Sequence, residues 1–303
     1  MAKLSFVTTA YNEEKKLREC LLSIKDIADE IIVINNSSID KTEEIAKEFT
    51  KKIFNKENNL MLNVNKNFGF SKASSEWILN LDPDERLTPE LKEEIKQILE
   101  ADDKNIDGYY IPRKNIIFGK WIKNSIWWPD YQLRLFRKNK GKFKEKHVHE
   151  LLEVDGKTKV LENPMLHLNY QSVSQFIKKM DLYTENEADN FIKTGKVFNP
   201  IDCLKMPIND FLKTFFSQNG YKDGFHGLVL SLLQSVYTLI SMVKVWEKSG
   251  FKEYNEKEVL SDFFSESKKI SKEIKYWILT FKIENSRSLI NKFFLKIKRK
   301  FLF

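Results

Sequence analysis

The chain has 303 residues, of which 42% are hydrophobic and 13% aromatic, a composition that excludes disorder over most of its length. Lys and Arg number 51 against 43 Asp and Glu, and the net charge of +8 favours anionic partners such as acidic lipids, phosphorylated substrates or nucleic acid. Cys20 and Cys203 match no metal-ligand spacing and indicate a reduced setting. The first residues enter a strand-like run without a signal-peptide pattern, so secretion is not expected.

Strand and helix signals alternate through the first hundred residues. Short apolar runs predict buried strands over residues 4–9, 31–34 and from residue 77. Helices are predicted to begin at Asn12, Asp40 and Thr88, each of a residue type that caps helices, with Pro89 at a first-turn position. Such alternation is typical of a parallel sheet with helices on both faces, so we expect an α/β fold.

Polar clusters follow three of these predicted strands, at residues 8–13, 35–40 and 82–85. In open parallel sheets, ligands bind at the carboxyl ends of the strands. The three segments therefore predict one composite site.

The pattern changes after residue 108. Residues 108–169 combine short strand signals with aromatic and basic side chains, and the chain reads as helical from Val173 onward. Residues 224–243 carry no formal charge and combine a wide apolar face with a narrow polar one. That pattern predicts either burial in a helical subdomain or an in-plane position at a membrane surface. Residues 291–303 mix bulky apolar and basic side chains, which favours an anionic membrane surface over a solvated basic tail.

Asp82-Pro83-Asp84 is the sharpest chemical signal. Two carboxylates just beyond a buried strand can hold Mg²⁺ or Mn²⁺, which would bind a diphosphate and neutralise the charge of a leaving group. The alternative is a solvated turn with helix-capping acids.

Three other residues fit nucleotide binding. Tyr11 could stack on a nucleobase while the hydroxyl of Thr9 binds its polar edge, although an exposed Tyr at a helix start gives the same pattern. Lys66 could reach a phosphate, or it could be a solvated lysine on a helix.

An aromatic and charged cluster covers residues 127–137, and His147-Val148-His149-Glu150 follows it. Aromatic rings beside carboxylates suit sugar binding, and Asp130 or Glu150 could act as general base on an acceptor hydroxyl. The two histidines would point to the same side of a strand. A zinc site is not expected, since the chain has four His and no paired Cys; a structural role or contact with a substrate phosphate fits better.

In combination, these motifs resemble family 2 glycosyltransferases. The resemblance rests on Thr-x-Tyr-Asn-Glu at residues 9–13, Asn-Ser-Ser-x-Asp at 36–40, Lys-Asn at 66–67 and Leu-Asp-x-Asp-Glu at 81–85. Residues 111–113, 119–122, 128–137 and 148–150 look like the branch that includes the lipooligosaccharide-core β-1,4-glucosyltransferases, as do residues 179–183 and 223–225.

The resemblance implies a GT-A fold, a Rossmann-like and mostly parallel sheet with flanking helices, over residues 1–200. A helical, basic, membrane-associating region over residues 201–303 would follow it. The implied reaction inverts the anomeric centre and moves glucose from UDP-glucose to a hydroxyl of a lipooligosaccharide or lipopolysaccharide core sugar.

The resemblance also implies roles for single residues. The nucleotide pocket would be lined by Thr9, Tyr11 and Glu13. Lys66 would approach the donor phosphates, Asp82 the ribose or the metal, and Asp84 the metal.

The base implied by the resemblance is again Glu150 or Asp130. At position 35, many members carry an Asp that binds the uracil imide. Asn35 can still accept that hydrogen bond through its carbonyl oxygen, and Ser37 replaces a frequent Gly.

We therefore expect a peripheral enzyme on the cytoplasmic face of the cell membrane, acting on a lipid-anchored glycan. The enzyme alternatives are a related transferase that uses another nucleotide sugar, or one with a protein or polyprenyl acceptor. A non-catalytic scaffold that binds nucleotide sugars is a further alternative. Nucleic acid is not an expected partner, since no nucleic-acid-binding motif is present.

Overall fold

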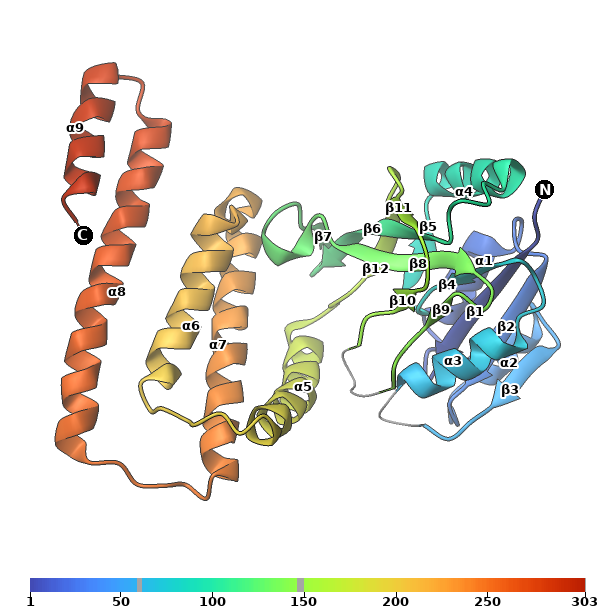
Figure 1. The fold of residues 1–303 in the computed structure, drawn as a ribbon, viewed down its shortest axis with the longest axis horizontal. Coiled ribbons are helices and arrows are strands. Elements are labelled where there is room, and N and C mark those ends of the chain that lie inside the picture. Colours follow the sequence, from blue (N-terminus) through green and yellow to red (C-terminus); the bar gives the residue numbers. More distant parts are fainter. Residues whose placement is uncertain (59–61, 146–149, 303) are drawn as a thin grey trace. The chain divides into compact units, whose positions relative to one another are not determined.

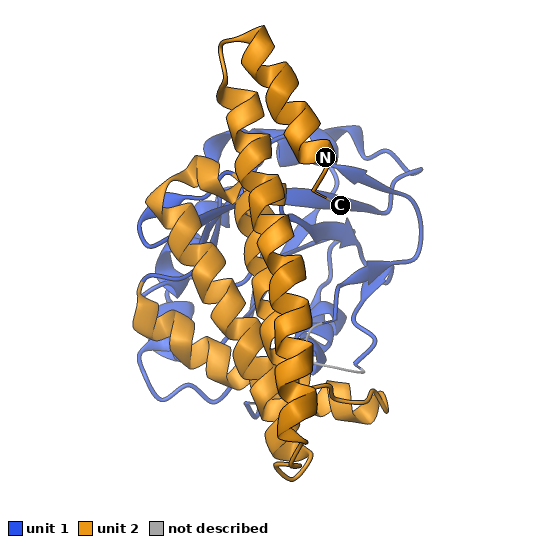
Figure 2. Cartoon of the chain, turned by 90° about the vertical axis from the view of Figure 1, so that its left-hand side faces the viewer, with its two compact units in different colours: residues 1–123, 127–171 blue, residues 124–126, 172–303 orange. Residues whose placement is uncertain are grey.

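The computed structural model describes residues 1–58, 62–145 and 150–302. The chain divides into two compact units (Figure 2). Unit 1 comprises residues 1–123 and 127–171, and unit 2 comprises residues 124–126 and the chain from residue 172 onward.

Unit 1 is an α/β unit (Figure 1). Its strands are β1 (Leu4–Ala10), β2 (Glu30–Asn35), β3 (Lys52–Asn55), β4 (Trp77–Asn80), β5 (Glu85–Leu87), β6 (Gly108–Ile117), β7 (Lys120–Trp121), β8 (Tyr131–Arg137), β9 (Gly141–Lys142), β10 (Glu153–Val154), β11 (Thr158–Val160) and β12 (Met165–Leu168). Its helices are α1 (Leu17–Ile24), α2 (Thr42–Lys47), α3 (Leu62–Lys72) and α4 (Pro89–Ala101).

The main sheet runs in the order β3-β2-β1-β4-β8-β6-β12-β5. The pairs β1–β2, β1–β4 and β2–β3 are parallel, and the sheet becomes mixed from β8 onward. The predicted α/β fold with a mostly parallel sheet and flanking helices is confirmed, as is the helical region that follows it.

Both faces of this sheet carry an apolar core. Successive residues of a strand point to opposite faces. Phe6 of β1 belongs to the cluster that contains residues of α1 and α4, whereas its neighbour Val7 belongs to the cluster that contains Phe70 of α3. Because each face of β1 is covered by one of these clusters, β1 is buried along its whole length. The loop that follows it therefore begins from a firmly packed strand end.

The three predicted helix starts in unit 1 differ in outcome. Helix α2 begins at Thr42, two residues after the predicted start at Asp40, whose Oδ1 accepts a hydrogen bond from the backbone N–H of Thr42 at 3.0 Å. Thr88 caps α4 as predicted, since its side chain accepts a hydrogen bond from the backbone N–H of Leu91, with Pro89 in the first turn. The prediction for Asn12 is wrong, because α1 begins at Leu17. Asn12 adopts a left-handed conformation (φ 53°), and its Oδ1 accepts a hydrogen bond from the backbone N–H of Ile39 instead.

Unit 2 is helical. Its α-helices are α5 (Val173–Lys193), α6 (Asp202–Leu212), α7 (Phe225–Lys248), α8 (Glu256–Asn285) and α9 (Leu289–Lys300). The sequence-based boundary at residue 200 stays a prediction. In the structure, unit 1 ends at residue 171, so α5 belongs to the helical unit. Within that unit, Asp181 of α5 pairs with Lys244 of α7 at 2.7 Å.

Helix α7 buries its polar stripe and exposes part of its apolar face. Ser231 and Ser241 are 2% exposed, and the hydroxyl of Ser241 donates to Glu187 of α5 at 2.8 Å. Leu232, by contrast, is 49% exposed and Val236 is 43% exposed. Among the described helices, α7 alone is long and apolar enough to cross a membrane, and one third of its apolar window is buried within the protein.

Candidate active site

Three loops meet at one edge of the parallel half of the sheet. Ala10 at the end of β1 pairs with Asn35 at the end of β2, and β4 runs beside β1 on its other side. The first two loops are tied together, since the backbone N–H of Asn12 donates to the Ser38 hydroxyl at 3.0 Å. The segments predicted to form one composite site are therefore neighbours in space.

The candidate nucleotide-binding residues of the first loop differ in exposure. Thr9 is 6% exposed, whereas Tyr11 is 43% exposed. The backbone N–H of Glu13 donates to the Thr42 hydroxyl at 2.8 Å, and the Glu13 carboxylate lies 3.5 Å from Lys16 Nζ. The exposed ring of Tyr11 offers a surface on which a planar base could stack.

Asn35 is held inside the second loop at 2% exposure. Its Nδ2 donates to Asn55 at 2.8 Å and to Glu43 at 3.2 Å, and its Oδ1 accepts from the backbone N–H of Ser38 at 3.1 Å. The carbonyl oxygen therefore has one lone pair left for a ligand donor.

Asp82 lies between two cations. Lys66 Nζ of α3 is 2.6 Å from Oδ1, and Arg134 Nη2 of β8 is 2.8 Å from Oδ2. Burial by itself would raise the pKa of Asp82, but the charges of Lys66 and Arg134 outweigh it and hold the pKa well below its usual range. Both carboxylate oxygens are therefore engaged with cations.

Asp84 faces a histidine that sequence reasoning missed. His167 Nε2 of β12 lies 3.6 Å from Asp84 Oδ2, and Lys16 Nζ lies 3.8 Å from the same oxygen. Burial opposes ionisation, but His167 and Lys16 lower the pKa of Asp84 to about 2. No local pattern pointed to His167, because β12 reaches Asp84 only through its pairing with β5 and β6.

A divalent metal, implied by the fold family, fits this pair. A carboxylate oxygen and an imidazole nitrogen that face each other are both donors such an ion accepts, and Mg²⁺ and Mn²⁺ usually take further ligands from water and substrate phosphates. Within residues 1–58, 62–145 and 150–302, no group of three or more His, Cys, Asp and Glu side chains could hold a metal by itself. Asp84 and His167 would therefore share the ion with the substrate.

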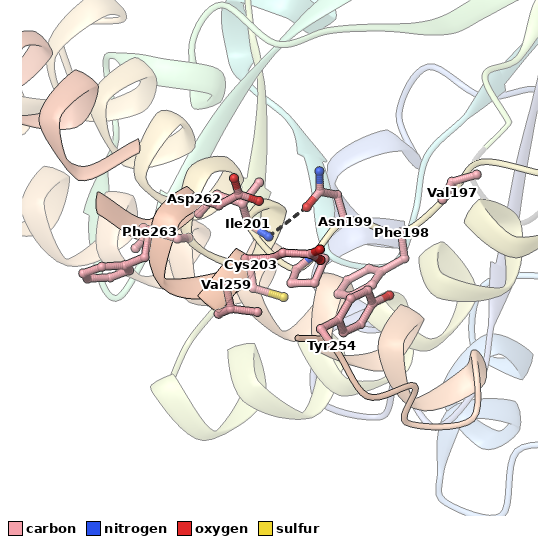
Figure 3. A pocket seen from close by; sticks show the side chains of 12 residues that line it. Val197, Phe198, Asn199, Ile201, Cys203, Tyr254, Val259, Asp262 and Phe263 are labelled. Atoms are coloured by element: carbon pink, nitrogen blue, oxygen red, sulfur yellow. Dashed lines mark hydrogen bonds between the residues drawn. The ribbon is translucent and has the colours of Figure 1, made fainter. Parts of the chain in front are cut away.

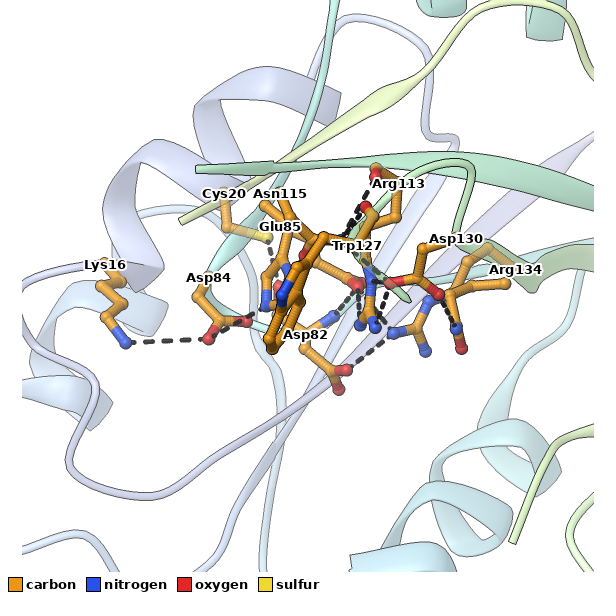
Figure 4. A network of polar contacts seen from close by, with 12 residues as sticks. Lys16, Cys20, Asp82, Asp84, Glu85, Arg113, Asn115, Trp127, Asp130 and Arg134 are labelled. Atoms are coloured by element: carbon orange, nitrogen blue, oxygen red, sulfur yellow. Dashed lines mark hydrogen bonds and ion pairs between the residues drawn. The ribbon is translucent and has the colours of Figure 1, made fainter. Parts of the chain in front are cut away.

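A chain of ion pairs through the buried Glu85 and Arg134 joins Asp82 to Asp130 (Figure 4). The fully buried Glu85 accepts from Arg134 at 2.7 Å and lies 3.4 Å from Arg113 Nη1. Arg113 Nη2 lies 2.6 Å from Asp130 Oδ2. Removing one partner of such a network would leave an uncompensated buried charge, so these groups hold each other in place.

Asp130 accepts hydrogen bonds on both carboxylate oxygens. Oδ2 accepts from Arg113 and from Asn115 Nδ2 at 3.0 Å, and Oδ1 accepts from Gln132 Nε2 at 2.7 Å. Burial would raise the pKa of Asp130, but the Arg113 charge and the amide donors lower it. The carboxylate is therefore ionised at neutral pH and fixed in orientation.

Glu150 belongs to a cavity of about 340 Å³ in unit 1. Lys66, Asp82, Arg113 and Arg134 also line this cavity, so it combines three cations with two carboxylates. The backbone N–H of Glu145 donates to Glu150 Oε2 at 2.6 Å. The predicted histidine positions 147 and 149 lie outside the described residues.

A second cavity, of about 550 Å³, lies within unit 2 (Figure 3). Its lining is mostly apolar and includes Phe198, Val259 and Phe263. Its charged lining groups in the described chain are the acids Glu258 and Asp262, so it offers no cation to a phosphate. The smaller cavity of unit 1 is the better match for an anionic ligand.

Comparison with known proteins places this site in a family. Residues 5–152 match the model described as Glycosyl transferase family 2. These residues form a family 2 glycosyltransferase domain. They contain Asp82, Asp84, Asp130 and Glu150, and the predicted family is confirmed for this part of the chain.

The chain is similar to bacterial glycosyltransferases over most of its length. It is 29% identical over 259 residues to the uncharacterized glycosyltransferase RT0209 of Rickettsia typhi, which covers 82% of this chain and 88% of the relative. It is 25% identical over 255 residues to the lipopolysaccharide core biosynthesis glycosyltransferase LpsC of Rhizobium meliloti, covering 82% and 94%. A structure of S. aureus TarS 1-349 in complex with UDP aligns over 84% of this chain and 93% of that one, with 17% identity and a TM-score of 0.44. The protein is a glycosyltransferase.

Proposed function

We propose that this glycosyltransferase transfers glucose from UDP-glucose, with inversion, to a sugar hydroxyl of a lipid-anchored lipopolysaccharide-type core. The observation that supports it most is the cavity beyond β4, where three cations from α3, β6 and β8 line one space with Asp82 and Glu150. The facing pair of Asp84 and His167 lies two residues further along the same loop. A diphosphate carries the charge that such cations bind.

The donor would lie along the three loops. Thr9, Tyr11, Glu13 and Asn35 would hold the uridine, with the Tyr11 ring against the base. Lys66 would neutralise charge on the donor phosphates, and Asp82 would bind the ribose hydroxyls or act as a further ligand of the metal. Asp84 and His167 would hold Mg²⁺ or Mn²⁺, which when bound supplies positive charge to the leaving diphosphate.

The reaction would be a single in-line displacement. The acceptor hydroxyl oxygen forms a bond to the anomeric carbon as the bond from that carbon to the diphosphate oxygen breaks, and UDP leaves. The hydroxyl proton passes to Asp130 or Glu150. We place Asp130 first, because donors from β6 and β8 fix both of its oxygens.

The acceptor proposal rests on two features. One is the similarity to LpsC of Rhizobium meliloti, whose name assigns it to lipopolysaccharide core biosynthesis. The other is a group of aromatic rings beside Asp130: Trp121 packs edge-on against Trp128 with centroids 5.3 Å apart, and Trp127 packs against Tyr170 at 6.3 Å. Apolar sugar faces pack on such rings.

A lipid-anchored acceptor implies work at the cytoplasmic surface of the membrane. On α9, Leu289, Phe293 and Phe294 are each more than 60% exposed, and its last turn carries Lys298, Arg299 and Lys300. An exposed apolar face next to basic residues fits an anionic lipid surface. We therefore propose peripheral attachment through unit 2.

Isothermal titration of the full-length protein tests the donor and the metal together. We expect UDP-glucose to bind in the presence of Mn²⁺ and to bind at least tenfold more weakly without it. Asp84→Ala should remove the Mn²⁺ dependence, whereas Asp26→Ala, which changes an exposed acid paired with Lys92, should not.

The outcomes separate the candidate functions. Tighter binding of another nucleotide sugar would replace glucose and favour the related-transferase alternative. Donor binding without turnover on any lipopolysaccharide-derived acceptor would favour a scaffold. If no nucleotide sugar binds with either metal, the proposed donor chemistry is wrong.

A further inference from the structure

Asn115 occupies the centre of the site without lining the cavity. It is fully buried on β6, and it pairs in register with His167 on the neighbouring parallel strand β12. A buried amide needs partners for both of its ends, so its hydrogen bonds define its orientation.

The amide group can point only one way. Asn115 Nδ2 lies 3.0 Å from Asp130 Oδ2 and 2.9 Å from the backbone oxygen of Trp127. Both of these atoms are acceptors, so the NH₂ end must face them and the carbonyl oxygen must face the other side. That oxygen lies 2.6 Å from His167 Nδ1.

The orientation of this amide sets the tautomer of the histidine. A carbonyl oxygen accepts and never donates, so His167 Nδ1 must carry a hydrogen. In the neutral ring the lone pair is then on Nε2, the atom that lies 3.6 Å from Asp84 Oδ2. A metal ligand needs that lone pair, and a hydrogen bond at the opposite ring nitrogen is the usual way proteins fix it.

We propose that Asn115 is a positioning residue that couples the two halves of the site. Its oxygen fixes His167 as a ligand through Nε2, and its NH₂ group holds the Asp130 carboxylate in orientation. This role rests on the proposed function, because it takes His167 as a metal ligand and Asp130 as the base. A purely structural Asn115 would satisfy the Trp127 carbonyl and leave the histidine tautomer unaffected.

Two substitutions separate the two ends of the amide. Asn115→Asp keeps an acceptor for His167 Nδ1–H but removes the donor to Asp130. Asn115→Leu keeps the approximate volume and removes both hydrogen bonds. Asn163→Ala is the matched control, because it removes an Asn side chain that bonds Glu94 outside this network.

The experiment uses the full-length protein and two readouts other than activity. Nitrogen-15 NMR of the metal-free protein reports the tautomer of His167, assigned with His167→Ala, among the four histidines of the chain. Titration with Mn²⁺ in the presence of UDP reports metal affinity. We expect wild type and Asn115→Asp to show the Nδ1–H tautomer and Mn²⁺ affinities within about threefold, while Asn115→Leu loses about 10- to 100-fold in affinity.

Turnover then tests the second end of the amide. Asn115→Asp should lower kcat at least tenfold while Mn²⁺ affinity persists, because the Asp130 orientation is lost. If Asn115→Leu does not fold, the Asn115→Asp variant alone tests the proposal: a lowered kcat with retained Mn²⁺ affinity supports it. An unchanged kcat of Asn115→Asp overturns it.

Two further results have distinct meanings. A wild-type protein that binds no Mn²⁺ with UDP overturns the proposed function. A wild type that binds Mn²⁺, together with an Asn115→Leu variant that binds it equally well and keeps the tautomer, overturns the role of Asn115 alone.

Discussion

Asp130 and Glu150 differ in how their carboxylates are held. Arg113, Asn115 and Gln132 donate to the carboxylate of Asp130, whereas Glu150 lines the cavity and its Oε2 accepts from the backbone N–H of Glu145. A general base needs a fixed direction toward the acceptor hydroxyl, and ionisation at neutral pH is already ensured by the lowered pKa of Asp130.

The amide variants of these two residues should separate them. We expect Asp130→Asn to lower kcat by about 10²–10⁴ with the Kd for UDP-glucose within about threefold, because the base is lost and the donor site is kept. Glu150→Gln should retain more than about one tenth of the turnover. Single-turnover transfer assays and titration calorimetry measure both quantities. The reverse pattern would assign the base to Glu150.

Some site residues could be identified from the sequence alone, whereas their partners could not. Asp82 and Asp84 could be found because they come just after an apolar strand. Thr9, Tyr11 and Glu13 could be found because they lie at or just beyond the end of another. The partners of Asp82 could not, since Lys66 comes from α3 and Arg134 from β8. Side chains far apart in the chain meet only once the strand order is set.

At the scale of elements, Gly69 lets α3 lie close to the sheet. A Cβ atom at this position would come within 2.6 Å of Val7 Cγ1 and 3.1 Å of Ile34 Cγ1. The helix that carries Lys66 is thereby held against β1 and β2.

Gly69→Ala should therefore destabilise the protein although alanine is the better helix former. Overpacking of a core costs about 1–3 kcal/mol, which we expect to exceed the gain in helix propensity of about 1 kcal/mol. Urea unfolding measures the difference. Ser71→Ala in the same helix is the control, because Ser71 is exposed. Equal or higher stability of Gly69→Ala would show that Val7 and Ile34 can shift to accept the added methyl group at little cost.

Glu30 fastens the start of β2 to its neighbours. Its carboxylate accepts from the Ser5 hydroxyl and from the backbone N–H of Ser74 at 2.9 Å, and it pairs with Lys52. Burial would raise the pKa of Glu30, but the bonds from Lys52, Ser5 and Ser74 outweigh it and lower the pKa to about 2 from 4.5.

The stability that Glu30 adds should depend on pH in a defined direction. Because its folded-state pKa is lowered, the contribution is complete above about pH 4.5 and is lost as the pH falls toward 2, and it amounts to about 3 kcal/mol. The free energy of unfolding of wild type minus that of Glu30→Gln, measured in urea from pH 7 to pH 2.5, should shrink across this window. A difference that stays constant with pH would contradict the assignment.

At the scale of the whole molecule, the helical unit combines exposed apolar side chains with positive charge. Phe293 and Phe294 are 62% and 63% exposed, within a helix that carries five basic residues, Lys292, Lys296, Lys298, Arg299 and Lys300. Helix α7 adds exposed Leu232 and Val236 to the surface of the same unit.

Vesicle sedimentation should reveal this surface. Wild type is expected to bind vesicles that contain phosphatidylglycerol and to release them as salt is raised, because lysines contribute through the surface potential. Replacing Phe293 and Phe294 together by Ser should weaken binding at least tenfold, since each buried Phe is worth about 1.5–3 kcal/mol. Val197→Ser, at an exposed site in the loop before α6, is the control. Equal binding by the double variant would exclude α9 as the contact.

The sequence by itself determined the features that depend on neighbours along the chain. The apolar runs, the Thr88-Pro89 helix start and the carboxylates after β4 follow from local spacing and backbone preference, so the α/β fold could be predicted. The glycosyltransferase domain was predicted from the resemblance of its motifs to a known family. The tertiary structure alone decided which groups meet. Pairing of β12 with β5 brings His167 to Asp84, and its pairing with β6 brings His167 to Asn115. Pairing of β6 with β8 brings Asn115 to Asp130. The polar stripe of α7 faces inward, where the buried Ser241 hydroxyl donates to Glu187 of α5.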